Sequence, residues 1–467
     1  MSDYTDTLNR ILARSLNTAV PIRTASSMSS DPAVTIGIAT VKIVTEEQIQ
    51  ALAFGPLNGR PTLILRINPI GRDVTDLAPF ATFLDQVARR AIAAEGELRV
   101  WVPHAETIEA LDILGHRYWR NQNAPTAIQR MGVICRNIAH EATFPGQQVV
   151  ADARALLQEH AVTGLAPVEE GHLGAMLAWF DPTVRDPLSE ARDRIRLPAS
   201  GILVNTPDQP MDDRVDRLRK DLKSATGRRR TRLISEIEDI LRWGILREWN
   251  LVVEARRAFL TLGLSVTGLD QLASDSKERM ASALQNGHFP ARRPDMLAQW
   301  LGQMETGVEK AEFAALEADP IVREEARRVG AVVQGVVTAV RQRRPRFKPC
   351  TIEVDSVQGT IRLRSDDKVR IAGSRVTGIV RAFQPLAGGG TRISVEIKDG
   401  VRQVGLLSVG ARFDILKEPY GFVNYRAMKH VRDRQPWAFF GTAAPALAPG
   451  PSRGISAIRV AAGVRRP

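Results

Sequence analysis

Cysteine and tyrosine are scarce in this chain. Its 467 residues include only two cysteines, Cys135 and Cys350, and four tyrosines. Two cysteines this far apart exclude a disulfide framework, and by themselves they cannot supply the four ligands of a structural zinc site. We therefore expect a protein of a reducing compartment, long enough for about two to four domains with ordinary hydrophobic cores.

Long apolar runs are also missing. The longest, residues 329–340, is interrupted by Gly330 and Gly335, whereas a membrane helix needs about 18 consecutive apolar residues. Residues 1–20 lack the apolar segment and the small-residue cleavage site of a secretory signal. The sequence therefore predicts a cytoplasmic protein that does not enter a membrane.

The motifs of several common enzyme classes are absent as well. The chain contains no GxxxxGK[ST] loop, no GxGxxG turn and no HExxH pair. His104, which follows the apolar run at residues 99–102, is the best candidate for a general acid or base. No serine nucleophile or carboxylate pair stands near it at a recognisable spacing, so a histidine in a turn or helix cap is the favoured interpretation. We predict no catalytic residue, no cofactor and no metal site.

What the chain does have is an uneven distribution of charge. The formal net charge is +12. Residues 331–467 contain 24 Lys plus Arg and 9 Asp plus Glu, a net charge of +15. Residues 1–330 contain 40 Lys plus Arg and 43 Asp plus Glu, a net charge of −3. A positive field of this size attracts polyanions, with nucleic acid the first candidate and an anionic membrane surface the second. A general preference for arginine in the composition is the alternative explanation.

The N-terminal part has the pattern of an α/β domain. Strands are predicted at residues 34–44, 61–67 and 97–102. Helical patterns occupy residues 46–53, 77–94 and 106–119. Alternation of strands and helices is typical of a parallel sheet. We therefore predict an N-terminal helix and linker over residues 1–33, followed by a Rossmann-like α/β layer over residues 34–144.

Residues 145–330 are predicted to form a helical domain. The longest amphipathic patterns cover residues 211–224 and 231–263. Gly227, Arg228, Arg229 and Arg230 lie between these two patterns. Such a cluster suits phosphate, but a charged turn between two helices is the favoured interpretation.

Beyond residue 330 the apolar residues alternate with polar ones, which predicts short strands. The alternating residues are Ile352 and Val354, Ile361 and Leu363, Val369 and Ile371, and Ile393, Val395 and Ile397. Glycines separate these runs, as in small barrels. We predict a small antiparallel β-barrel over residues 331–440, so that the fold class is α/β plus all-β, and a disordered basic tail over residues 441–467.

The cations of this region are the predicted nucleic-acid-binding residues. Side chains alternate along a strand, so those between the apolar residues face outward: Arg362, Arg364, Lys368, Arg370, Arg392 and Lys398. A further run precedes them: Arg341, Arg343, Arg344, Arg346, Phe347 and Lys348. Tyr425, Arg426 and Lys429 again combine cations with an aromatic ring. Arginine forks match phosphate geometry, and aromatic rings stack on unpaired bases.

Two alternatives remain open for the same region. Glu396 and Lys398, with Asp366 or Asp367 upstream, have the composition of a metal-dependent nuclease site. No third carboxylate stands at a defined spacing, and Glu-x-Lys is common on charged strands. A scaffold whose basic surface binds an acidic partner protein is the other alternative.

Short segments of the chain resemble known proteins. Residues 367–373, followed by residues 378–381, resemble the strand, glycine, strand pattern of SH3-like or OB-like small barrels. Residues 63–68, residues 99–102 with their following helix to residue 117, and residues 177–182 resemble accessory regions of superfamily 1 DNA helicases. This second resemblance implies a factor without its own motor that docks a helicase or another ATPase. It also favours DNA over RNA as the polymer. No helicase motif is present, so the resemblance assigns no catalytic residue.

Overall fold

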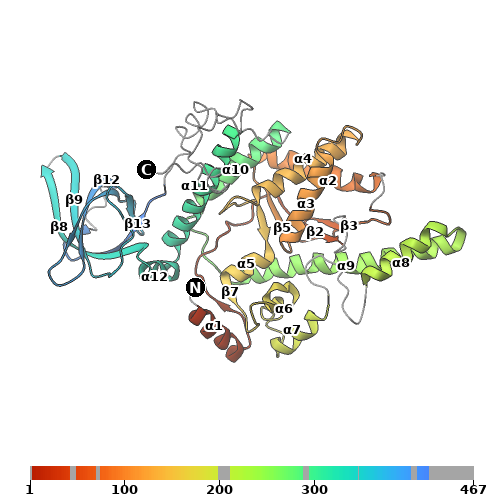
Figure 1. Ribbon diagram of the computed structural model, residues 1–467, viewed down its shortest axis with the longest axis horizontal. Coiled ribbons are helices and arrows are strands. Elements are labelled where there is room, and N and C mark those ends of the chain that lie inside the picture. Colours follow the sequence, from red (N-terminus) through yellow and green to blue (C-terminus); the bar gives the residue numbers. More distant parts are fainter. Residues whose placement is uncertain are drawn as a thin grey trace, which may run out of the picture. The chain divides into compact units, whose positions relative to one another are not determined.

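The computed structural model describes residues 3–42, 49–69, 74–197, 211–287, 294–344, 347–400 and 407–419 (Figure 1). Residues 1–289 and 306–421 form one unit, and residues 290–305 and 422–467 form a second. Of the second unit, the structure describes only the beginning of helix α11 (Pro294–Ala318). The first unit contains a mixed five-stranded sheet with its helices and a six-stranded antiparallel sheet near the C-terminus.

The five-stranded sheet contains both parallel and antiparallel neighbours. Its strands are β2 (Thr35–Lys42), β3 (Ile49–Gly55), β4 (Thr62–Leu65), β5 (Arg99–Val102) and β6 (Val150–Asp152), in the order β4-β3-β2-β5-β6. The strands β2, β5 and β6 run parallel, whereas β3 is antiparallel to both β2 and β4. The expectation of an entirely parallel sheet is therefore wrong. Strand β6 lies beyond residue 144, where the α/β layer was predicted to end. The sheet therefore contains strands from both sides of that predicted boundary.

Strand β3 explains this error. Residues 46–53 were expected to form a helix, yet Ile49–Gly55 is a strand in which every residue is buried. On one face Phe54 contacts Phe80, with ring centroids 4.9 Å apart, and on the other face Ala51 and Ala53 belong to a separate buried cluster. A strand covered on both faces loses its apolar and polar alternation, so its sequence does not distinguish it from a buried helix.

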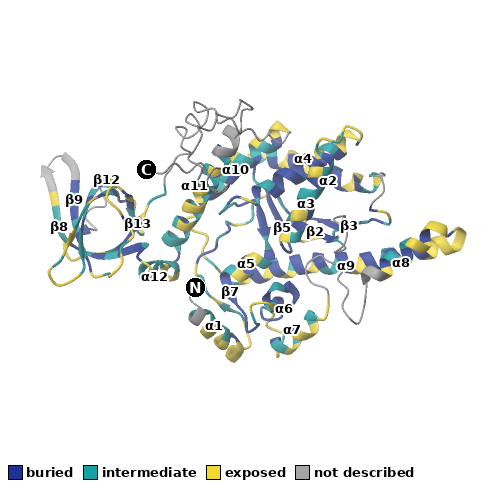
Figure 2. Cartoon of the chain, in the orientation of Figure 1, coloured by how far each residue is buried: buried dark blue, intermediate teal, exposed yellow. Residues whose placement is uncertain are grey.

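Helices cover both faces of this sheet. One face packs against α2 (Ala78–Ala93), α3 (Ala105–Tyr118) and α4 (Thr126–Glu141). The helices expected at residues 77–94 and 106–119 are confirmed as α2 and α3, whereas α4 was not predicted. The long helix α9 (Gly227–Thr261) contacts β2, β3 and β4 on the other face. Figure 2 shows the sheet strands as buried between these helices.

Gly37 allows α9 to approach strand β2 closely. A Cβ atom at this position would lie 2.6 Å from the Leu57 side chain and 3.0 Å from the Trp249 ring of α9. Contacts this short are incompatible with normal packing, so any side chain here forces the ring or the helix to move. The glycine in the middle of a strand is therefore a packing requirement.

The remaining helices precede or follow this layer. They are α1 (Asp3–Leu16), α5 (Ala153–His160), α6 (Leu173–Leu177), α7 (Pro187–Ile195), α8 (Met211–Ser224), α10 (Asp270–Asn286) and α12 (Pro320–Arg328). The prediction of two long helices at residues 211–224 and 231–263 is confirmed, and α8 and α9 contact each other. Within the described ranges, none of the helices is both long and apolar enough to cross a lipid bilayer.

The C-terminal sheet is antiparallel throughout. Its strands are β8 (Val332–Arg344), β9 (Phe347–Ser356), β10 (Lys368–Ile371), β11 (Thr377–Pro385), β12 (Thr391–Asp399) and β13 (Arg412–Lys417), in the order β10-β11-β12-β9-β8-β13. The last strand of this order, β13, pairs with the first, β10. The alternating residues form its core, as expected, but Ile361 and Leu363 precede β10 in a segment that is not a strand.

Candidate functional sites

Two arginines on the outer surface of the C-terminal sheet are paired with carboxylates. Arg392 of β12 lies opposite Asp355 of β9, and its Nε and Nη2 atoms donate to the two carboxylate oxygens over 2.7 and 2.8 Å. The guanidinium holds the pKa of Asp355 below its usual value. Arg341 of β8 lies 2.7 Å from the neighbouring carboxylate of Glu353. Both cations do face outward, but they share that surface with acidic residues.

Lys398 is also paired. Its Nζ lies 2.5 Å from Glu396 Oε1, and Arg381 Nε donates to Glu396 Oε2 over 2.7 Å. Arg381 Nη1 also donates to Asp366 over 2.7 Å. Lys398 and Arg381 lower the pKa of Glu396. A guanidinium therefore bridges the two carboxylates that a nuclease would need for its metal, and the described residues contain no cluster of three or more potential metal ligands.

Arg370 connects the sheet to helix α11. Its Nη2 lies 2.6 Å from Glu418, its Nη1 lies 3.3 Å from Glu317, and its guanidinium carbon is 5.1 Å from the centre of the Phe313 ring. Two carboxylates and an aromatic ring surround this cation. Its contacts are those of a structural residue that fixes the end of α11 to the strand.

Three of the predicted binding residues are exposed and form no ion pair with a described residue: Arg362, Arg364 and Lys368. They lie in the segment that enters β10. This segment is held in place, because Asp367 accepts a hydrogen bond from the backbone N–H of Arg364 over 2.8 Å and forms an ion pair with Lys417. We call Arg362, Arg364 and Lys368 the β10 cations.

Lys368, the last of the β10 cations, lies where the chain leaves the last described strand. The backbone N–H of Glu418, directly after β13, donates to the carbonyl oxygen of Lys368 over 2.8 Å. Residues 420–467 contain 8 Lys plus Arg and 1 Asp plus Glu, and Tyr425, Arg426 and Lys429 are among these residues, outside the described ranges.

The remaining predicted residues lie in the hairpin of β8 and β9. Arg344 pairs with Phe347 across the hairpin, so the cationic run at residues 341–348 occupies its end. The structure describes the backbone of Arg343, Arg344, Phe347 and Lys348 in these strands but not their side chains. Arg346 lies outside the described residues.

A second candidate site lies at the carboxyl ends of the parallel strands, where open α/β sheets bind ligands. His104 follows β5, precedes α3 and is completely buried. Its Nε2 lies 3.1 Å from Glu248 Oε2, and its Nδ1 lies 2.7 Å from Glu106 Oε2 at an angle outside the hydrogen-bond range. Burial alone lowers the pKa of His104, but these two carboxylates outweigh it and raise the pKa.

The groups around His104 complete a partly buried ion network. Arg154 lies 3.4 Å from Glu106, whose pKa falls to about 2 because the contact with His104 outweighs the effect of burial. Burial raises the pKa of Asp152, at the end of β6. His104 does not line the pocket described below, nor the hollows at residues 228–239 and around Arg99. This geometry suits a charged link between α9 and the sheet better than general acid or base catalysis on a substrate. The sequence indicated His104 alone, because Glu248 lies on a distant helix.

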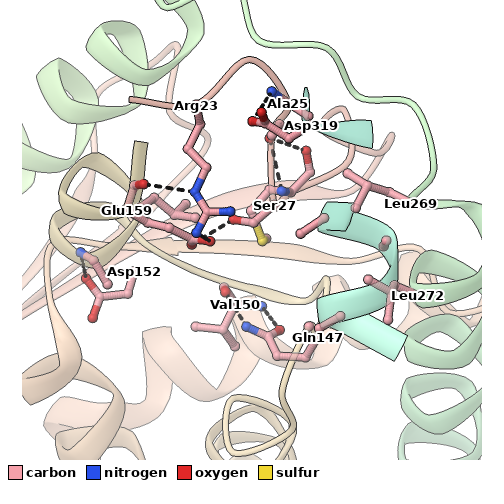
Figure 3. A pocket seen from close by; sticks show the side chains of 18 of the residues that line it. Arg23, Ala25, Ser27, Gln147, Val150, Asp152, Glu159, Leu269, Leu272 and Asp319 are labelled. Carbon is pink, nitrogen blue, oxygen red and sulfur yellow. Dashed lines mark hydrogen bonds and ion pairs between the residues drawn. The ribbon is translucent and has the colours of Figure 1, made fainter. Parts of the chain in front are cut away.

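A pocket of about 260 Å³ lies between the segment at residues 23–28, helix α5 and the facing ends of α10 and α11 (Figure 3). Its polar groups bond mainly to one another. Arg23 and Ser27 both contact Glu159, and Asp319 accepts hydrogen bonds from the backbone N–H groups of Thr24 and Ala25. The other lining residues are largely apolar, including Leu269 and Leu272. The pocket therefore contains few polar groups that are available to a ligand.

No protein-family model, curated protein or solved structure matches this chain.

Proposed function

We propose that this protein binds nucleic acid through its C-terminal region and acts as an accessory factor. In this proposal the six-stranded sheet is a small barrel of the OB-like or SH3-like kind, and the β10 cations hold the phosphate backbone. The supporting observation is that Arg362, Arg364 and Lys368 are exposed and form no ion pair with a described residue. A phosphate reaches these cations without displacing a carboxylate.

The distribution of charge supports the same site. The described residues between 331 and 419 contain 14 Lys plus Arg and 8 Asp plus Glu. The other residues of the segment 331–467 contain 10 Lys plus Arg and 1 Asp plus Glu. Most of the positive excess therefore lies outside the described ranges, chiefly in residues 420–467. Contacts of flexible or exposed cations with phosphate are electrostatic and carry little sequence information. We expect weakly sequence-specific binding, with DNA favoured over RNA.

A partner protein is part of the proposal, and a helicase or another ATPase is the class that the resemblance implies. Helix α1 supports a docking role because it exposes an apolar stripe, with Leu8 47%, Ile11 56%, Leu12 45% and Leu16 58% exposed. Apolar side chains gathered on one helix face are typical of surfaces that contact another protein. This surface lies in the N-terminal region and leaves the C-terminal cations free for nucleic acid.

The direct test is a salt titration of the full chain with fluorescently labelled single-stranded DNA, duplex DNA and RNA. We expect the Kd to rise at least about 100-fold between about 50 and 200 mM salt, because each phosphate contact releases counterions. Absence of binding, or binding that salt does not weaken, contradicts the proposal. Cleavage of the labelled DNA with magnesium or manganese would favour the nuclease alternative. Capture of a protein partner that survives nuclease treatment, without DNA or RNA binding, would favour the scaffold.

A further inference from the structure

Helices α8 and α9 form a hairpin whose free end is strongly basic. Residues 217–232 contain eight Lys plus Arg and one Asp, although residues 1–330 as a whole have a net charge of −3. Figure 2 shows this end of the hairpin as exposed. Five of its cations are exposed and form no ion pair with a described residue: Lys220, Lys223, Arg228, Arg229 and Arg232. We call these five residues the hairpin cations.

The packing of the two helices brings these cations together. Leu218 and Leu222 of α8 and Leu233 and Ile237 of α9 belong to one buried cluster, so the polar faces of both helices point to solvent. Arg219, at the base, is directed inward and donates to the carbonyl oxygen of Ile67 over 3.0 Å. Arg230 at the turn donates to the carbonyl oxygen of Leu222 over 3.3 Å. The five hairpin cations have no such acceptor among the described residues and remain available to a ligand.

The position of the arginines on α9 is electrostatically unfavourable without a counterion. Arg228 and Arg229 lie in the first turn of a 35-residue helix, where the helix dipole already places positive charge. This turn contains no acidic residue, and the Thr226 side chain accepts no hydrogen bond from it. An anion bound here would offset both the dipole and the repulsion among the cations. A hairpin turn with only a structural role would not need cations at this end of the helix.

A shallow hollow beside the turn adds groups suited to phosphate. Arg228, Arg232, Thr231 and Ser235 line it, together with two carboxylates. Arg214 engages Glu236 over 2.6 Å, and Arg242 lies 3.7 Å from Asp239. Two guanidinium groups and two hydroxyls offer several donors to phosphate oxygens. The hollow is open to solvent, as a site for a polymer backbone must be.

We propose that the hairpin cations are a second contact with the nucleic-acid backbone, separate in sequence from the C-terminal contact. This inference rests on the proposed function and extends it. One polymer would bind both regions of the same chain, so the affinity of the full chain exceeds that of either contact alone. A phosphate-rich backbone is favoured over an acidic protein because the hollow combines arginine forks with hydroxyl donors.

The test compares two full-length variants that lose the same charge. The hairpin variant K220Q/K223Q/R228Q/R229Q removes four of the hairpin cations. The control R90Q/R185Q/R192Q/R257Q removes four exposed arginines elsewhere in the body. We expect the hairpin variant to raise the Kd for duplex DNA about 10-fold or more and to reduce the slope of log Kd against log salt by about two to three, since each contact contributes about 0.9. The control should change the Kd less than about threefold.

Two further measurements separate binding from folding. The Tm of the hairpin variant without DNA should equal or exceed that of the wild type, because cations have been removed from a helix N-terminus. In the wild-type protein, DNA should slow trypsin cleavage after Arg228, Arg229 and Arg230. Equal loss of affinity in both variants, or cleavage that DNA does not slow, would overturn the inference.

The outcomes also distinguish this inference from the proposed function. If the wild-type chain binds no nucleic acid, the proposed function fails. If it binds and the hairpin variant binds equally well, only the second contact is wrong. Binding of the wild type to phosphatidylserine vesicles that the hairpin variant loses, with DNA binding unchanged, would assign the hairpin to a membrane surface and would also contradict the inference.

Discussion

The imidazole Nε2 of His104 lies 3.1 Å from the Oε2 of Glu248, and both side chains are buried. His104 lies between strand β5 and helix α3, whereas Glu248 lies on helix α9, which covers the sheet. A charged hydrogen bond in this position connects two elements that are far apart in the sequence. The carboxylate also compensates a buried imidazolium, which would otherwise be costly.

The first prediction concerns this pair. Substitution E248Q should lower the free energy of unfolding by about 2 kcal/mol at pH 6, because it removes the charge that stabilises a buried cation. Urea unfolding followed by circular dichroism measures the change. The control is E109Q, which removes an exposed carboxylate that pairs with Lys42, and we expect it to cost less than about 1 kcal/mol. Equal costs would contradict the role assigned to Glu248.

The pH dependence of stability follows from the same groups. The pKa of His104 is raised from 6.5, so its contribution is fully present below about pH 6.5 and is lost as the pH rises through the folded value. The pKa of Glu106 falls from 4.5 to about 2, so its contribution is present above about pH 4.5 and is lost as the pH falls toward 2. Stability should decline on both sides of this interval, and E248Q should flatten the decline on the alkaline side. An unchanged alkaline profile in E248Q would show that Glu248 does not set the pKa of His104.

Gly37 provides a test of the packing between α9 and the sheet. G37V places atoms where the Leu57 side chain and the Trp249 ring already lie, so it should destabilise the protein by about 1–3 kcal/mol. Thermal unfolding measures this as a lower Tm. G171A is the matched control, because a Cβ atom there meets no atom within 4 Å. A tolerated G37V would mean that α9 does not press on β2 at this point.

The fourth prediction separates unpaired from paired cations of the C-terminal sheet. R362Q/R364Q/K368Q should raise the Kd for DNA about 10-fold or more, because these side chains are free to contact phosphate. R341Q/R392Q/K398Q removes the same charge, but each of these residues is engaged by a carboxylate. We expect this second variant to raise the Kd less than about threefold. If the two variants weaken binding equally, the wider set of residues indicated by the sequence contacts the backbone.

The two cysteines provide a chemical test of burial. Burial raises the pKa of both Cys135 and Cys350, so little thiolate is present at pH 8. We expect neither thiol to react with a disulfide reagent such as DTNB in the native protein, and both to react in denaturant. Rapid labelling of one thiol in the native state would show that its strand or helix opens locally.

Parts of this fold were predictable from the sequence and others were not. Helices α2, α3 and α8 show clear apolar periodicity, and their predicted limits nearly match the structure. Strand β3 has no such periodicity, because it is buried on both faces. Its mistaken assignment as a helix removed the antiparallel strand that makes the sheet mixed.

The candidate sites were also only partly predictable from the sequence. Alternation along β12 correctly predicted that Arg392 faces outward, yet its partner Asp355 is set by the register of β9 and β12, which a single sequence does not contain. The same holds for His104, whose environment depends on Glu248. Local pattern thus predicts which way a side chain points, and tertiary pairing decides whether its charge is available to a ligand.

Asp319 has a consequence for the order in which the chain assembles. Its carboxylate accepts the backbone N–H groups of Thr24 and Ala25, which are separated from it by 295 and 294 residues. During synthesis the N-terminal segment leaves the ribosome long before Asp319 does, so this junction closes only after the whole α/β layer has been made. Contacts of such wide sequence separation form late. The hydrogen bonds of Thr24 and Ala25 to Asp319 are therefore completed only when the segment leading into the C-terminal sheet arrives.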